Sequence, residues 1–141
     1  MRIVEEFAAR GHPNITATHS TTLEITKGFS LSKMGDCIVA VNSTRGLFDL
    51  SQDFREACMN DRSRIFVELS VSGIVERIAG KGSHLLTLAD EKDLVIRKST
   101  YVSNRTLMIN ADKAASDLPR QFIQRLASAS TDIHVRLTVR L

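Results

Sequence analysis

Hydrophobic and polar positions alternate with a period of two over much of the chain, which is the spacing typical of β-strands. The same period runs through residues 3–9 and 64–72. It is clearest in residues 131–141, where the apolar positions are Ile133, Val135, Leu137, Val139 and Leu141. We expect these three segments to be strands that turn one face toward the core.

Two further strand-like runs lie near the N-terminus. Residues 19–26 are rich in β-branched side chains, and residues 36–41 form a short apolar run. The connection between them is short enough for an antiparallel hairpin. If Thr26 faces Asp36, the apolar side chains align on one face and Glu24 lies diagonally from Asp36 on the other. This register predicts two neighbouring carboxylates on one surface.

The remaining pattern adds two helices and several short strands. Ser51 is a good N-cap for a short helix to Asn60. Asp117 is the expected N-cap of a second helix with Pro119 in its first turn. Short strands with intervening turns are expected at residues 74–79, 85–88 and 94–99 as a β-meander, and a further short strand is expected at residues 105–109. Together these elements predict an α+β fold: a mostly antiparallel, curled or barrel-like sheet of seven to eight strands with two helices.

The 141 residues fit a single domain, residues 1–141, and we find no internal repeat, linker or low-complexity tract. No apolar run reaches the length of a membrane span, and the first residues do not resemble a signal peptide. We therefore expect a cytoplasmic protein with no membrane partner. Cys37 and Cys58 lie inside apolar patterns, which indicates two buried free thiols.

Glu24, Asp36 and His19 are the candidate catalytic residues. Two carboxylates on one face repel unless a cation or metal lies between them, so such a pair suits acid–base or metal-assisted chemistry. The alternative is two solvated, inert acids, and on a regular strand His19 points away from Glu24. The spacing of His12, His19 and Cys37 matches no metal-binding motif. No metal site is predicted, and the sequence names no cofactor.

The net charge of +3 and the pI near 9.1 give a mild bias toward anionic partners. On the last strand, Arg136 and Arg140, with His134, face outward; three phosphate contacts would give a salt slope of only about −2 to −3. A pocket for a phosphate group fits better, although ordinary solvated surface charge is the alternative. Its candidate ligand-binding residues are Thr22, Thr26, Lys27, Arg97, Lys98, Arg105 and Lys113.

Three functions therefore stay open. The preferred one is a binding module for a small anionic, phosphate-bearing ligand or a short RNA. The second is a small enzyme that uses Glu24 and Asp36, with His19. The third is a structural or assembly partner that uses an exposed sheet edge or apolar patch. The sequence contains no P-loop, dinucleotide fingerprint or nucleophile elbow, and it does not indicate an oligomeric state.

Three segments carry a resemblance to a known family: GHPNITATHSTTLEITK, GDCIVAV and ADKAA. They resemble an archaeal family of conserved proteins catalogued as domain of unknown function 371. The resemblance implies a small, stand-alone, cytoplasmic archaeal protein and assigns no activity. The family has a glycine near Ala40, so one point of close backbone approach is lost here. The family's motif positions in this chain are His12, His19, Thr21, Thr22, Glu24, Thr26, Lys27, Gly35, Asp36, Asp112 and Lys113.

Overall fold

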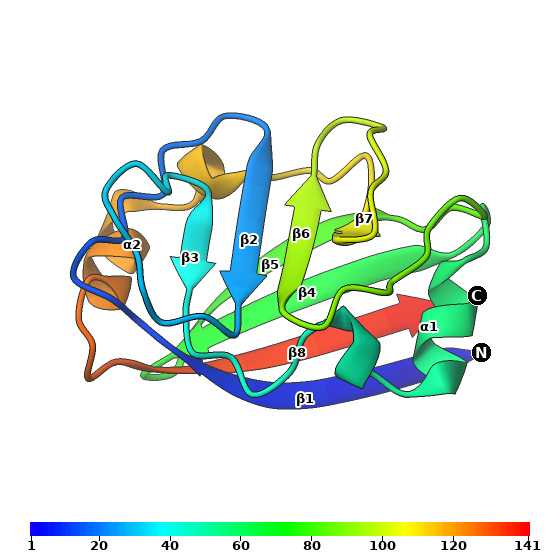
Figure 1. Cartoon of the computed structure of the whole chain (residues 1–141), viewed down its shortest axis with the longest axis horizontal. Coiled ribbons are helices and arrows are strands. Elements are labelled where there is room, and N and C mark those ends of the chain that lie inside the picture. Colours follow the sequence, from blue (N-terminus) through cyan, green and yellow to red (C-terminus); the bar gives the residue numbers. More distant parts are fainter.

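The computed structural model describes residues 1–141 and has eight strands, two α-helices and two short 3-10 helices (Figure 1). The α+β class and the two helices are as predicted. The strands are β1 (Arg2–Arg10), β2 (Thr22–Thr26), β3 (Ile38–Ala40), β4 (Arg64–Val71), β5 (Ile74–Lys81), β6 (Asp93–Arg97), β7 (Thr106–Met108) and β8 (Asp132–Arg140). The helices are η1 (Leu47–Asp49), α1 (Gln52–Cys58), η2 (Ala115–Asp117) and α2 (Arg120–Leu126).

The strands form two four-stranded sheets, and neither sheet closes on itself. Sheet A has the order β1-β8-β4-β5 and is antiparallel throughout. Sheet B has the order β3-β2-β6-β7, with two parallel pairs flanking an antiparallel one. In Figure 1 the short strands of sheet B run across the long strands of sheet A. The barrel-like form is therefore not confirmed. The predicted meander is wrong, because residues 85–88 form no strand and β5 and β6 belong to different sheets.

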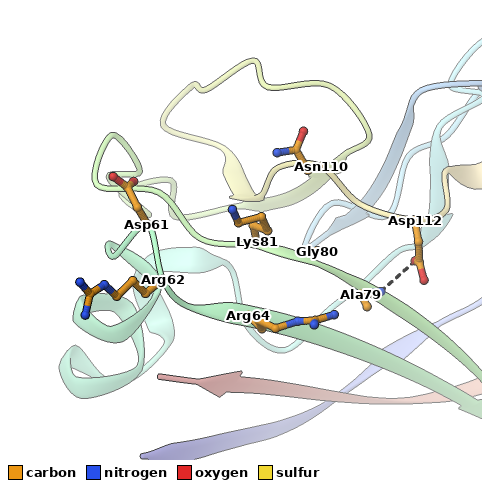
Figure 2. A pocket seen from close by; sticks show the side chains of 8 residues that line it. All are labelled: Asp61, Arg62, Arg64, Ala79, Gly80, Lys81, Asn110 and Asp112. Carbon is orange, nitrogen blue, oxygen red and sulfur yellow. Dashed lines mark hydrogen bonds between the residues drawn. The ribbon is translucent and has the colours of Figure 1, made fainter.

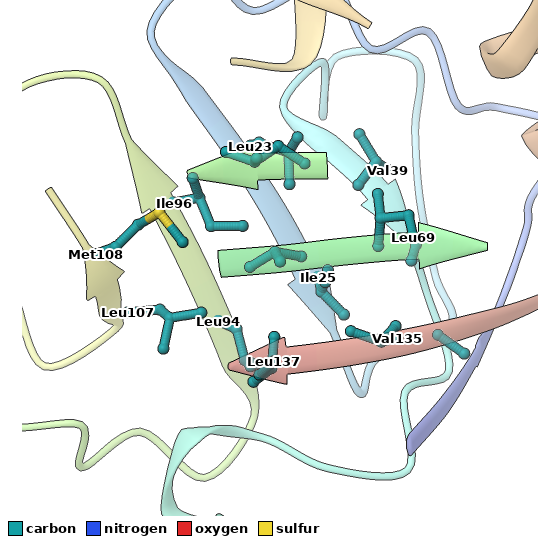
Figure 3. Packing of buried hydrophobic residues seen from close by; sticks show 14 of the residues in the cluster. Leu23, Ile25, Val39, Leu69, Leu94, Ile96, Leu107, Met108, Val135 and Leu137 are labelled. Atoms are coloured by element: carbon teal, nitrogen blue, oxygen red, sulfur yellow. The ribbon is translucent and has the colours of Figure 1, made fainter. Parts of the chain in front are cut away.

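The core lies between the inner faces of the two sheets (Figure 3). Burial alternates along β4 and β8 as the period-two pattern predicts. Each fully buried Leu or Ile contributes about 1.5–3 kcal/mol, so this double layer supplies much of the stability. The labelled side chains that meet in this layer are Leu23, Ile25, Val39, Leu69, Leu94, Ile96, Leu107, Met108, Val135 and Leu137.

The helices add apolar side chains to the same core. The hydroxyl of Ser51 accepts a hydrogen bond from the Phe54 N–H (3.2 Å), which confirms the predicted N-cap of α1. The second helix begins later than predicted. Asp117 belongs to η2, where its carboxylate accepts from the Ala114 N–H (2.8 Å), and Pro119 is the N-cap of α2.

The predicted hairpin between residues 19–26 and 36–41 is wrong. β2 and β3 pair in parallel, with Glu24 opposite Ile38. The antiparallel partner of β2 is β6, where Glu24 lies opposite Val95. β6 occupies the antiparallel edge of β2, and the connection of residues 27–37 carries β3 to the other edge, where it pairs in parallel. The apolar face of β2 is buried as expected, but through a different neighbour.

The two halves of the chain have the same fold, contrary to the expectation of no internal repeat. Each half contains three strands, a 3-10 helix, an α-helix and a fourth strand, in that order. The hydrogen bond from the Glu24 N–H to the Cys37 carbonyl (2.9 Å) recurs as one from the Val95 N–H to the Arg105 carbonyl (2.8 Å). The strand orders of both sheets are unchanged when the halves are exchanged. The fold is therefore a pseudo-two-fold duplication.

The duplication is also visible in the sequence. Residues 3–11 read IVEEFAARG and residues 74–82 read IVERIAGKG. Residues 65–71 read IFVELSV and residues 133–139 read IHVRLTV. Even an unusual backbone conformation is shared, because Asn42 and Asn110 both have a positive φ (52° and 51°). Most residues thus have an equivalent in the other half, which we call the mate, and differences between mates mark where the halves have diverged.

Candidate functional site

Glu24 lies in a cluster of charged side chains on sheet B. Its carboxylate accepts a hydrogen bond from the guanidinium of Arg105, which precedes β7. The same guanidinium pairs with Asp93 of β6, at 3.0 Å between Nε and Oδ2. The side chain of Glu24 is only 9% exposed. The cation beside Glu24 is therefore Arg105.

The pKa of Glu24 is raised from 4.5 to about 7, chiefly because burial disfavours the charged carboxylate. The positive charge of Arg105 opposes this rise, and the neighbouring Asp93 adds to it. The second carboxylate of this cluster is thus Asp93, because the hairpin that would bring Asp36 beside Glu24 does not form. Asp36 instead offers its backbone carbonyl to the N–H groups of Thr18 and His19 (2.9 and 3.1 Å).

His19 has a structural contact of its own. Its Nδ1 accepts from the backbone N–H groups of Thr21 and Thr22 (3.2 and 3.1 Å), which closes the turn before β2. Its mate Asp90 does the same with Oδ2, which accepts two backbone N–H groups at 3.0 and 2.6 Å. Because His19 and its mate Asp90 make the same contact in the two halves, we assign to His19 the stabilisation of a turn.

The predicted ligand-binding residues do not gather in one place. Thr26 accepts from the Gly28 N–H (3.1 Å), while Thr22 is half-buried on β2. Arg97 donates to Thr106 (2.9 Å) and lies near Arg105, whose charge lowers the pKa of Arg97 after the larger effect of burial. The three lysines are each held in an ion pair of their own: Lys27 with Asp49, Lys98 with Asp117, and Lys113 with Glu76.

A hollow of about 690 Å³ lies at the corner where β4 begins and β5 ends (Figure 2). We call it the corner pocket. Three cationic side chains line it, together with Asn110 on the segment after β7. Its full lining is Asp61, Arg62, Arg64, Ala79, Gly80, Lys81, Asn110 and Asp112.

The cations of the corner pocket have no carboxylate partner. Arg62, Arg64 and Lys81 are exposed, and none takes part in an ion pair. The two acids of the pocket accept hydrogen bonds from backbone N–H groups. Asp61 accepts from the His84 N–H (2.8 Å), and Asp112 accepts from the Ala79 N–H (2.9 Å; dashed line in Figure 2). Three guanidinium and ammonium groups are therefore free to bind an anion.

The other half contains the mate of this pocket, a hollow of about 650 Å³ lined by residues such as Arg10, Lys27, Asn42 and Asp132. Both of its cations are paired. Arg10 binds Asp132 at 3.0 Å, and Lys27 binds Asp49 at 3.0 Å. Asp132 is the mate of Arg64, so the duplication has one acidic and one basic residue at the same place. In the mate pocket each cation is neutralised by a carboxylate, whereas the cations of the corner pocket are not.

The corner pocket continues into a line of positive charge across the outer face of sheet A. Arg64 lies opposite Lys81 on one side and opposite Arg140 on the other, and Arg140 lies opposite Arg2. We call this line, Lys81-Arg64-Arg140-Arg2, the basic row. All four side chains are exposed, and none of them is in an ion pair. Like charges directly opposite one another destabilise a sheet, so folding does not account for the row.

A second line on the same face has the arrangement that folding favours. There the charges alternate in sign across the four strands, in the order Arg77, Glu68, Arg136 and Glu6. Between the two lines lies Phe66, whose ring is covered by the guanidinium groups of Arg77 (4.2 Å), Arg140 (5.2 Å) and Arg64 (5.7 Å). The excess charge is therefore confined to one end of the face.

Sequence reasoning placed Arg140 outward but missed Arg2, Arg64 and Lys81. Period two assigns each of them to the outer face of its own strand. Only the register of three strand pairs brings them into line, and that register is a property of the sheet. The internal repeat was the missed signal, because it shows that Arg64 stands where the other half has Asp132.

The fold and the site define a duplicated α+β protein with one neutral and one cationic end. The family model described as "Domain of unknown function (DUF371)" matches residues 7–140, and the chain belongs to this family. The chain is 45% identical over 118 residues to "Uncharacterized protein MJ0206" of Methanocaldococcus jannaschii, which covers 84% of this chain and 87% of that protein. The predicted resemblance is confirmed, and neither match assigns an activity.

None of the helices is both long enough and apolar enough to span a membrane. The structure brings together no group of three or more His, Cys, Asp or Glu side chains of the kind that holds a metal ion.

Proposed function

We propose that this protein is a binding module for a phosphate-bearing anion, held in the corner pocket. The observation that carries the proposal is the contrast between two equivalent hollows. In the mate pocket both cations are neutralised by carboxylates, whereas in the corner pocket Arg62, Arg64 and Lys81 are left without one. Guanidinium groups bind phosphate through two parallel hydrogen bonds, and an ammonium group adds a point charge.

The test is a titration of the full chain with pyrophosphate, followed by isothermal calorimetry and by thermal unfolding. We expect saturable binding and a rise in Tm, because a ligand at 100 times its Kd stabilises the folded state by about 2.7 kcal/mol. Arg64→Gln and Lys81→Gln should each weaken binding. Arg10→Gln, the matched control in the mate pocket, should leave it unchanged. Equal losses in all three variants, or no binding at all, would overturn the proposal.

A second candidate function is acid–base chemistry at Glu24. The observation that favours it is a buried carboxyl group whose pKa lies near 7, within reach of a guanidinium. Asp93 and Arg105 would then set the protonation of Glu24, and His19 and Asp36 would have no direct part in it. A screen of phosphate esters and small acyl substrates with wild type and Glu24→Gln addresses this candidate. Turnover that survives the substitution would remove it.

A further inference from the structure

Resting on the proposed function, we infer that the phosphate in the corner pocket belongs to a single-stranded nucleic acid that lies along the basic row. The row begins in the pocket, because Lys81 and Arg64 belong to both. From there it runs across β8 to Arg2 on the far edge of the sheet. A small ligand would use one end of this line, whereas a chain of phosphates would use all of it.

The dimensions of the row suit a strand. Neighbouring strands of a sheet are about 4.8 Å apart, so the row is about 14 Å long from β5 to β1. Its residues lie on an open, four-stranded antiparallel face that no helix covers, as the exposure of Arg2, Arg64 and Arg140 shows. A duplex presents both strands on a convex cylinder, whereas a single strand can lie flat on such a surface. The row therefore favours a single strand.

The side chains beside the row can also receive bases. Arg64 and Arg140 each lie over the ring of Phe66, at 5.7 and 5.2 Å from its centre. Stacking on the ring holds the guanidinium planes in place, and bases of unpaired RNA stack on guanidinium planes as well as on aromatic rings. The guanidinium groups that neutralise phosphates thus also offer flat surfaces for stacking. They do not present hydrogen-bond donors in a pattern that would distinguish one base from another. We expect weak sequence preference.

The residues at the opposite end of sheet A are the mates of the basic row and allow a direct comparison. The mates of the row are Arg10, Asp132, Ser72 and Gly73, which include one cation, and that cation is bound by its acidic neighbour. The alternating line of Arg77, Glu68, Arg136 and Glu6 carries no net charge. Binding should therefore depend on the basic row and on neither of the other two lines.

The experiment measures fluorescence anisotropy of a labelled oligouridylate with the full chain, at NaCl concentrations from 50 to 200 mM. Four phosphate contacts on a single strand give a slope of log K against log[NaCl] of about −2.8, which is about a 50-fold loss of affinity over this range. The double substitution Arg2→Gln with Arg140→Gln should reduce the slope to about −1.4, a loss of about sevenfold. Because both residues lie outside the corner pocket, this variant should still bind pyrophosphate like wild type.

The control variant is Arg10→Gln with Arg136→Gln, which removes one cation from each of the same two strands, β1 and β8, outside the row. It should keep the slope of wild type. Circular dichroism melts establish that both double variants are folded. Oligodeoxyuridylate of equal length distinguishes RNA from DNA, and either one binding with the expected slope supports the inference.

Three results would overturn it. Oligonucleotide binding whose slope does not change in the Arg2/Arg140 variant, while pyrophosphate still binds, would restrict the site to a small ligand. A duplex that binds as tightly as the single strand would exclude the proposed geometry. Binding of anionic phosphatidylglycerol vesicles through Arg2 and Arg140, without binding of oligonucleotide, would assign the row to a lipid surface. If wild type itself does not bind pyrophosphate, the proposed phosphate site in the corner pocket is rejected instead.

Discussion

The buried carboxyl group of Glu24 should make the stability of this protein depend on pH. Its pKa rises from 4.5 to about 7 on folding, chiefly because burial disfavours the charged form. At about 1.36 kcal/mol per pKa unit, this difference corresponds to about 3.4 kcal/mol. An acid with a raised pKa binds its proton more tightly in the folded state. Its contribution is therefore fully present below pH 4.5 and is lost as the pH rises through about 7.

Glu24→Gln removes this titration while keeping the size and polarity of the side chain. Between pH 5 and pH 8, Glu24 should cost wild type about 2.5 kcal/mol of its free energy of unfolding, and the variant should not show this loss. The difference in stability between variant and wild type should thus shift by about 2.5 kcal/mol in favour of the variant from pH 5 to pH 8.

Urea unfolding followed by circular dichroism at both pH values measures this shift. Glu91→Gln, a substitution of an exposed acid in the turn before β6, is the control and should give the same difference at both pH values. A Glu24→Gln effect that is equal at pH 5 and pH 8 would refute the reasoning, since it would mean that Arg105 keeps Glu24 ionised throughout.

Three further predictions follow from the contacts of individual side chains. Phe54→Ala should lower the free energy of unfolding by about 3–5 kcal/mol in urea melts, because its ring is fully buried in the core. In the same assay, Asp49→Ala and Asp117→Ala should each lower the free energy of unfolding by about 1 kcal/mol. The two losses should be similar, because each of these mates accepts a hydrogen bond from a backbone N–H group and forms an ion pair with a lysine. Ellman's reagent should label neither Cys37 nor Cys58 in the folded protein at pH 8 and both in urea, because burial raises the pKa of both thiols, that of Cys37 to about 11. Rapid labelling of either thiol under native conditions would contradict that assignment.

The elements themselves follow from local pattern. The strands β1, β4 and β8, the helix α1 with its Ser51 cap, and the buried face of α2 could all be predicted, because period and capping act over a few neighbouring residues. The partners of β2 could not. Its apolar face is satisfied equally well by β3 in antiparallel order or by β6, and only the competition among all strands of sheet B selects β6.

By itself, the sequence determined most of the strands and both helices, the apolar faces of the long strands, and the family. Only the tertiary structure decided which charges meet. Glu24 pairs with Arg105, which lies 81 residues away in the sequence, rather than with Asp36. Four cations, one from each strand, form a line on sheet A. The reason is that periodicity fixes the face on which a side chain lies, whereas the neighbour across the sheet depends on register. Register is set by long-range pairing that no single segment contains.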